Sequence, residues 1–109
     1  AVVRNNVMKA NGHGAFFSFW GGQIQIQDSM DVEVHGNYVE NGSSGGNGIM
    51  VIFQGGRGTG AYGEWGGYRN NVHHNTVVLQ ARAAITGYAA EDSVTDAASA
   101  GNTMNHNAY

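Results

Sequence analysis

A short pattern of alternating apolar and polar residues returns four times along the chain, each time with an asparagine at the same place. The copies occupy residues 3–8, 34–39, 72–77 and, in a weaker form, 99–104. In the second copy, valines alternate with Glu33 and His35. Alternation with period two, rich in β-branched residues and ended by Gly or Asn, predicts strands. Because no copy has the apolar spacing of a long helix, we expect an all-β chain.

The spacing of the copies predicts that they stack. Self-similarity at intervals of 31, 38 and 27 residues is typical of a solenoid, in which each repeat buries its apolar face against its neighbours. Asparagines at the same bend of successive coils can hydrogen-bond through amides roughly 4.8 Å apart. We therefore predict a structural ladder of Asn6, Asn37, Asn75 and Asn102. The expected apolar columns are Val3/Val34/Val72 and Met8/Val39/Val77/Met104.

The second copy continues into a longer unit. Residues 32–39 are followed by a glycine-rich turn at 40–47 and then by Gly48-Ile49-Met50-Val51. In this order the chain resembles the right-handed parallel β-helix repeat family, whose units run apolar-x-apolar-x-x-Asn-x-apolar, then a turn, then Gly-Ile-x-Val. Residues 14–19 and 84–88 match that second strand in the first and third coils. The fourth coil departs, because Ala97 and Ser99 replace the valines.

The resemblance implies a single right-handed parallel β-helix domain over residues 1–109, with about four coils and two loop insertions. It also implies a secreted or extracellular protein. It leaves the activity open, because this family includes lyases, hydrolases, epimerases, adhesins and passive scaffolds.

Composition agrees with such a sheet and narrows the partners. Eighteen glycines and twelve asparagines suit tight turns, and the absence of proline leaves backbone N–H groups free for strand pairing. A net charge of −3 with 12% charged residues gives no electrostatic case for binding nucleic acid or an anionic membrane. No apolar run is long enough to insert into a bilayer. Zero cysteines exclude disulfides and thiolate metal sites.

A bare coil needs roughly 20–25 residues, so the intervals of 31 and 38 residues indicate two insertions. The smaller excess surrounds residues 20–27, and the larger is a loop of glycine and aromatic residues at 55–68. Loops inserted into solenoids often carry binding. Aromatic rings can stack on a pyranose, and charged groups can hydrogen-bond hydroxyls or a uronate carboxylate. The predicted carbohydrate-binding residues are Arg57, Tyr62, Glu64, Trp65 and Tyr68. Two alternatives stay open: Trp65 and one tyrosine anchor the loop, or the loop contacts a protein.

Histidines that share one face of the predicted stack are candidate metal ligands. Arg4, His35 and His73 align in one outward-facing column. Two imidazoles one rung apart could hold a metal ion, but no carboxylate shares the column and Arg4 would oppose a cation. We therefore predict a solvated face and no metal site. His74 is expected to hydrogen-bond within its turn, and His106 to be an isolated turn residue.

The residues do not point to catalysis. Lys9 is the single lysine and has no acidic cluster nearby in sequence, whereas a β-helix lyase needs a base and often Ca²⁺. Calcium is expected only if the acidic stretch at 91–96 forms a binding loop; otherwise no cofactor is indicated. Asp28, Asp31 and Glu33 are expected to be solvated, and pairing Asp31 with Glu64 would be needed for a hydrolase. We predict no catalytic residues. Asn41-Gly42-Ser43 is a glycosylation sequon in a predicted turn.

Two functions remain. No amphipathic helix covers either end of the stack, and exposed strand edges recruit further strands. The leading hypothesis is a non-catalytic extracellular scaffold whose copies stack head to tail into filaments, with the loop at 57–68 presented to a polysaccharide. The alternative is an excerpt of a longer solenoid, part of a polysaccharide lyase or glycoside hydrolase.

Overall fold

The computed structural model describes residues 1–11, 21–43, 45–54, 57–81, 83–91 and 100–109, and no helix occurs among them. None of the described elements is therefore a helix long and apolar enough to cross a membrane. The described residues form an all-β structure, as the alternating pattern predicts, and three of their sheets are parallel.

The chain visits the three parallel sheets in the same order on each circuit. The first circuit contains β1 (Val2–Arg4), β2 (Val7–Lys9) and β3 (Gly22–Gln27). The second contains β4 (Glu33–His35), β5 (Tyr38–Glu40) and β6 (Asn47–Gln54). The third contains β9 (Asn71–His73), β10 (Thr76–Val78) and β11 (Gly87–Glu91), and β12 (Thr103–Asn105) follows. An antiparallel hairpin of β7 (Thr59–Gly60) and β8 (Gly63–Glu64) lies between β6 and β9.

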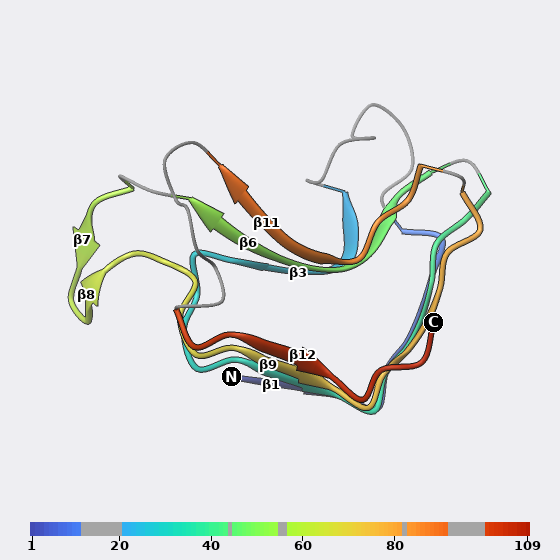
Figure 1. Ribbon diagram of the computed structural model, residues 1–109, viewed down its shortest axis with the longest axis horizontal. Coiled ribbons are helices and arrows are strands. Elements are labelled where there is room, and N and C mark those ends of the chain that lie inside the picture. Colours follow the sequence, from blue (N-terminus) through green and yellow to red (C-terminus); the bar gives the residue numbers. More distant parts are fainter. Residues whose placement is uncertain (12–20, 44, 55–56, 82, 92–99) are drawn as a thin grey trace.

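Each strand pairs with its equivalent in the next circuit. Sheet A has the order β1-β4-β9-β12, sheet B the order β10-β5-β2, and sheet C the order β11-β6-β3. Figure 1 looks along the stack, so that the strands of each sheet overlie one another and sheets A and C lie across from each other. The β7–β8 hairpin projects from one side of this arrangement.

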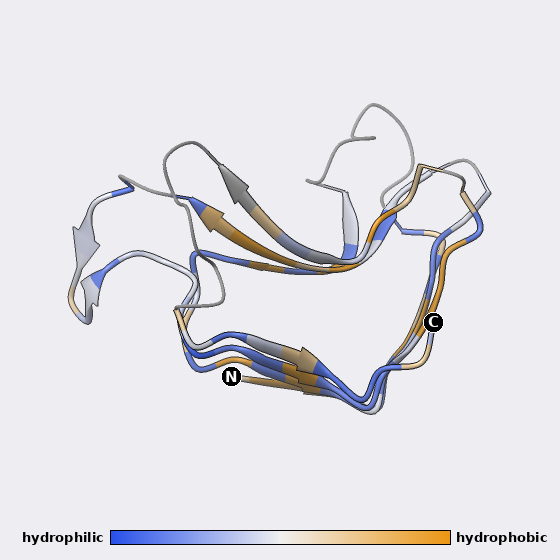
Figure 2. Ribbon diagram, viewed as in Figure 1, coloured by the Kyte–Doolittle hydropathy of each residue, from blue (hydrophilic) through white to orange (hydrophobic). Residues whose placement is uncertain are grey.

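The parallel register builds the apolar core. In sheet A, Val3, Val34, Val72 and Met104 are successive partners. In sheet B, Met8, Val39 and Val77 are partners. The central valines of both columns are almost completely buried, and Figure 2 shows hydrophobic residues recurring along the stacked strands. Both predicted columns are confirmed except for Met104, which belongs to the Val3 column and not to the Met8 column.

Sheet C differs from the expected alignment. β3 pairs with β6, with Ile24 opposite Ile49 and Ile26 opposite Val51. All four side chains belong to the core cluster. The strand at 24–27 is thus part of the wall and not part of an insertion, because its Ile-Gln-Ile-Gln alternation turns both isoleucines inward. The second strand predicted at 14–19 lies outside the described residues.

The bend after each strand of sheet A has a left-handed backbone. Asn5, Gly36, His74 and His106 occupy equivalent places and have φ angles of 57°, 64°, 53° and 52°. Asparagine and glycine tolerate this conformation well. Because the bend recurs in every circuit, it brings the next residue, an asparagine each time, to the same place in the stack.

Candidate functional site

A ladder of asparagine side chains runs through the stack. Asn6, Asn37 and Asn75 each donate both the backbone N–H and the side-chain Nδ2 to the Oδ1 of the next asparagine, at 2.9–3.0 Å. The last acceptor is Asn107. Asn37 and Asn75 are buried, and their Nδ2 groups also donate to carbonyls of sheet A. The amides are thus satisfied by one another, as buried amides require.

Asn102 is not a member of this ladder, which corrects the prediction. It lies before β12, whereas the ladder asparagines follow a strand of sheet A. The Oδ1 of Asn102 accepts the backbone N–H and Nδ2 of Asn70 at 2.9 and 3.0 Å, and the Oδ1 of Asn70 accepts the N–H of Val32. The sequence contains a signal for the correct alignment, because His74-Asn75 and His106-Asn107 repeat the same dipeptide.

The two ends of the ladder carry complementary groups. Asn6 Oδ1 accepts no hydrogen bond from the described residues, although every later Oδ1 in the ladder accepts two. At the other end, the backbone N–H of Asn107 has no acceptor among the described residues, and its Nδ2 donates to Val72 O. One end therefore offers an acceptor and the other offers donors.

The glycine and aromatic loop forms one wall of a hollow. Its volume is about 540 Å³, and its other wall is the turn that follows β3. The lining includes Asp28, Asp31, Tyr62 and Trp65. A second hollow of about 310 Å³ is lined by Gln27, Asp28, Arg57 and Trp65. Since Asp28 and Trp65 line both, the two hollows adjoin; we call them together the loop groove.

The hairpin holds Trp65 in place while leaving its ring accessible. The backbone N–H of Trp65 donates to Gly58 O at 2.9 Å. The indole lies so close to Gly60 that a Cβ at position 60 would be 2.3 Å from Trp65 Nε1. The side chain remains 52% exposed, and Tyr62 is 93% exposed. Two aromatic side chains therefore stand at the groove with much of their surface in solvent.

The predicted carbohydrate-binding residues divide into two groups. Arg57, Tyr62 and Trp65 line the loop groove. Tyr68 and Glu64 line neither of its hollows. The Tyr68 ring instead packs edge-on against Phe53 at 5.3 Å between centroids. Glu64 is exposed and pairs across the hairpin with Thr59. Tyr68 is thus packed as an anchor of the loop, whereas Trp65, the other residue of the anchoring alternative, stays half exposed.

Two carboxylates in the groove were expected to be merely solvated. Asp28 Oδ1 accepts the backbone N–H of Gln54 at 2.8 Å. Asp31 accepts two hydrogen bonds from Arg69, at 2.8 and 2.6 Å, and this contact lowers the pKa of Asp31. Both aspartates have a left-handed backbone, with φ of 42° and 56°. Aspartates in this segment are a sequence signal for a turn. Only the fold places the turn after β3 opposite the glycine and aromatic loop.

Lys9, Asp31 and Glu64, which could act as acids or bases, have different surroundings. Lys9 on β2 forms an ion pair with Glu40 on β5 at 3.2 Å, and the hydrogen bond that its ammonium group donates to Glu40 raises the pKa of Lys9. A lysine held protonated in this way is a poor general base. Asp31 lines the groove but Glu64 does not. Of the two carboxylates that a hydrolase would need, only Asp31 thus lines the groove.

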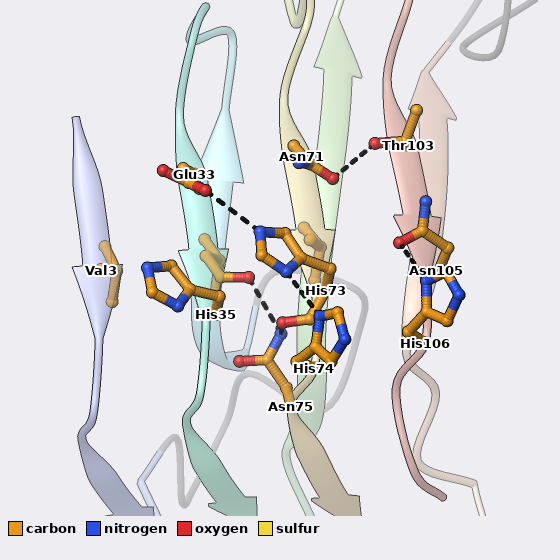
Figure 3. Close-up of polar contacts among 12 residues, drawn as sticks. Val3, Glu33, His35, Asn71, His73, His74, Asn75, Thr103, Asn105 and His106 are labelled. Atoms are coloured by element: carbon orange, nitrogen blue, oxygen red, sulfur yellow. Dashed lines mark hydrogen bonds and ion pairs between the residues drawn. The ribbon is translucent and has the colours of Figure 1, made fainter.

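Four histidines gather on the outer face of sheet A and the bends beside it (Figure 3). His35 and His73 are stacked with centroids 5.2 Å apart, and so are His74 and His106. His106 is thus not isolated, which corrects the prediction. His73 Nδ1 lies 2.8 Å from His74 Nδ1, and His73 Nε2 lies 3.1 Å from a carboxylate oxygen of Glu33. Among the described residues, no group of three or more histidine and acidic side chains is placed to hold a metal ion.

The sequon and the acidic stretch have different outcomes. The Asn41 side chain is fully buried, and its Nδ2 donates to Gly46 O at 2.8 Å. This nitrogen is therefore not accessible for a glycan in the folded chain. The proposed calcium stretch at 91–96 lies almost entirely outside the described residues.

No protein-family model, curated protein or solved structure matches this chain.

Proposed function

We propose that this chain is a right-handed parallel β-helix of about four coils that serves as a non-catalytic scaffold outside the cell. Its copies stack head to tail into filaments, and its loop groove takes a polysaccharide. The three parallel sheets and the recurring register support the coil assignment. The extracellular location and the handedness rest on the resemblance of the repeat to β-helix proteins.

The ends of the asparagine ladder carry the proposal of stacking. Within the ladder, each asparagine N–H donates to the Oδ1 of the next asparagine. The N–H of Asn107 in one copy could donate in the same way to Asn6 Oδ1 of the next copy, because neither group has a partner among the described residues. A second copy placed in the same register would join these groups and extend the ladder without a change of geometry. Such a contact is heterologous and does not close on itself, so it produces an open filament.

The strand edges beside the ladder favour the same contact. β1 and β12 are the two edges of sheet A. The register Val2–Glu33–Asn71–Thr103 would place Thr103 of one copy against Val2 of the next. Likewise, partly buried Val3 and Met104 would meet and continue the apolar column. Strand edges that carry apolar side chains are the usual template for strand addition.

Stacking can be tested by electron microscopy and sedimentation over a range of protein concentrations. We expect filaments with an axial repeat near 19 Å, about four strand spacings. Replacing both Val2 and Thr103 with lysine should abolish filaments, because like charges directly opposite repel. The matched variant Val2→Lys with Thr103→Glu should restore them. Small particles at every concentration, or filaments of the double-lysine variant at low salt, would contradict the proposal.

The loop groove is the observation that favours polysaccharide binding. Trp65 borders both hollows and keeps half of its surface exposed. Aromatic faces bind the apolar face of a sugar ring, and the neighbouring Asp28, Asp31 and Arg57 can hydrogen-bond hydroxyls. A groove with an aromatic wall and a few charged groups at its rim suits an extended, weakly charged sugar chain.

Oligosaccharide panels and Trp65 fluorescence test this binding. Trp20 is replaced by phenylalanine so that emission reports on Trp65 alone. Binding should shift the emission and should be lost in Trp65→Ala, whereas Glu64→Gln should bind normally because Glu64 does not line the groove. Absence of binding across neutral and acidic polysaccharides would refute it. New reducing ends or unsaturated products would instead favour the polysaccharide-degrading enzyme.

A further inference from the structure

Outside the loop groove, the histidine cluster is the group of side chains best placed to bind a ligand. Its central feature is the contact of adjacent residues His73 and His74, whose Nδ1 atoms face each other at 2.8 Å with the ring planes at 88°. Figure 3 shows the two rings converging beside sheet A. Two ring nitrogens at this separation must share either a proton or another cation.

Glu33 determines which nitrogen of His73 carries a proton. Its carboxylate lies 3.1 Å from His73 Nε2, so that Nε2–H is the donor and Nδ1 keeps its lone pair. Metal-binding histidines in proteins characteristically donate their second ring N–H to a carboxylate in this way. The stack of His35 on His73, with planes 1° apart, further fixes the ring orientation.

The separation of the nitrogens suits one metal geometry. Two nitrogens bound at right angles, each about 2.0–2.1 Å from the ion, are about 2.9 Å apart. Right-angled coordination by nitrogen and oxygen is the preference of Cu²⁺, which is also the divalent first-row ion that such ligands bind most tightly. We propose that the Nδ1 atoms of His73 and His74 form a surface site for Cu²⁺, with water completing the coordination.

The rest of the face is compatible with a cation. The titratable and charged groups around the pair are Glu33 and His35 on β4, His106 after β12, and Arg4 on β1. Arg4 pairs with His35 and is thereby one strand further from His73. Occupation requires that His74 carry its proton on Nε2 and not on Nδ1, so that both Nδ1 atoms have a lone pair for the ion. The site is independent of the stacking and of the polysaccharide groove.

The stack provides matched variants for a test. His74→Asn and His74→Gly remove one ligand, and both fit the left-handed bend, where Asn5 and Gly36 occur naturally. His73→Asn removes the other, and Asn105 is its equivalent in the next circuit. His106→Asn is the control, because it makes the same substitution at the same bend and keeps both proposed ligands, removing only the ring that stacks on His74. His13 is replaced by asparagine in all proteins, so that it cannot contribute.

The measurement is titration of the metal-free protein with Cu²⁺ at pH 7.5, followed by calorimetry and electron paramagnetic resonance. We expect one equivalent bound with hyperfine coupling from two nitrogens. His73→Asn, His74→Asn and His74→Gly should each weaken binding at least tenfold, and His106→Asn less than twofold. Glu33→Gln, a positioning change, should weaken binding by about tenfold. The proposal would be overturned if Cu²⁺ binding survived the loss of His73 or His74, or if His106→Asn weakened binding as much as His74→Asn. Circular dichroism of the metal-free variants verifies that they are folded.

Discussion

Asn75 donates its backbone N–H and its side-chain Nδ2 to a single oxygen, Oδ1 of Asn107, at 3.0 and 2.9 Å. The same bifurcated acceptance joins Asn6 to Asn37 and Asn37 to Asn75. Each rung therefore satisfies the one before it and depends on the one after it. An asparagine inside the ladder should therefore contribute more to stability than an asparagine on the solvent-exposed face of sheet A.

Replacing Asn37 with leucine tests the ladder. The change removes the acceptor of two Asn6 donors and the Nδ2 donor to two carbonyls of sheet A. It also leaves Asn75 Oδ1 with only the backbone N–H of residue 37 as a donor. Because buried polar groups without partners cost about 1–3 kcal/mol each, we expect a loss of at least about 2 kcal/mol in the free energy of unfolding. Urea denaturation measures it. Asn105→Ala on the exposed face of sheet A is the control; equal stability of both variants would show that the ladder is not stabilising.

A glycine at the start of the buried strand β6 tests the packing between circuits. A Cβ on Gly48 would meet Val77 Cγ1 at 2.7 Å and Thr86 Cβ at 3.1 Å. Overpacking of this kind typically costs about 1–3 kcal/mol, which we expect for Gly48→Ala. Gly67→Ala is the matched control, because its nearest neighbour would be 3.4 Å away. Thermal unfolding of the two variants should differ by several degrees, and indistinguishable midpoints would contradict the close packing.

Gly60→Ala should change the position of the Trp65 ring without changing the stability of the fold. Its Cβ would overlap the indole, at 2.3 Å from Nε1, so that the ring must move. We expect altered Trp65 emission and loss of polysaccharide binding, with an unfolding midpoint close to that of the parent because the hairpin projects from the stack. Thr59→Ala, in the same hairpin, should change neither. Unchanged emission of Gly60→Ala would mean that the ring is not seated there.

The ion pair of Asp31 and Arg69 predicts a dependence on pH. The hydrogen bonds from Arg69 lower the folded-state pKa of Asp31 below its ordinary value of 3.8. Its contribution to stability is therefore present above pH 4 and is lost as the pH falls through the lower, folded-state pKa. Since both groups are solvent-exposed, the effect on stability is small. Carboxyl NMR titration should show the lowered pKa, and Arg69→Gln should return it towards 3.8.

The sequon at Asn41 should remain unmodified in folded protein secreted from a glycosylating host. The Asn41 amide is buried and bonded to Gly46 O, and its Oδ1 accepts the backbone N–H of Gln80. Val7→Thr supplies a positive control, because it creates a sequon at the exposed Asn5. Intact-mass spectrometry distinguishes the two sites. A glycan on Asn41 of folded protein would show that this turn opens.

The alternation of apolar and polar residues was sufficient to predict strands, the Val3 and Met8 columns and the first three rungs of the ladder. This is because side-chain direction in a strand follows sequence with period two. The alternation was not sufficient where the local pattern allowed two alignments of the last repeat. Asn102 and Asn107 both follow small or polar residues, and only the pairing of β12 with β9 decides which joins Asn75.

The groove and the histidine cluster depended on tertiary structure. Asp28 and Trp65 are 37 residues apart, and they border the same hollows only because the β7–β8 hairpin lies against the turn after β3. Likewise, Glu33 meets His73, and His106 meets His74, only through parallel register between circuits. The apolar–polar pattern was enough to predict the strands of sheets A and B, because strand formation is a local property of the pattern. Contacts between circuits were decided by the lengths of the intervening loops, which the pattern does not encode.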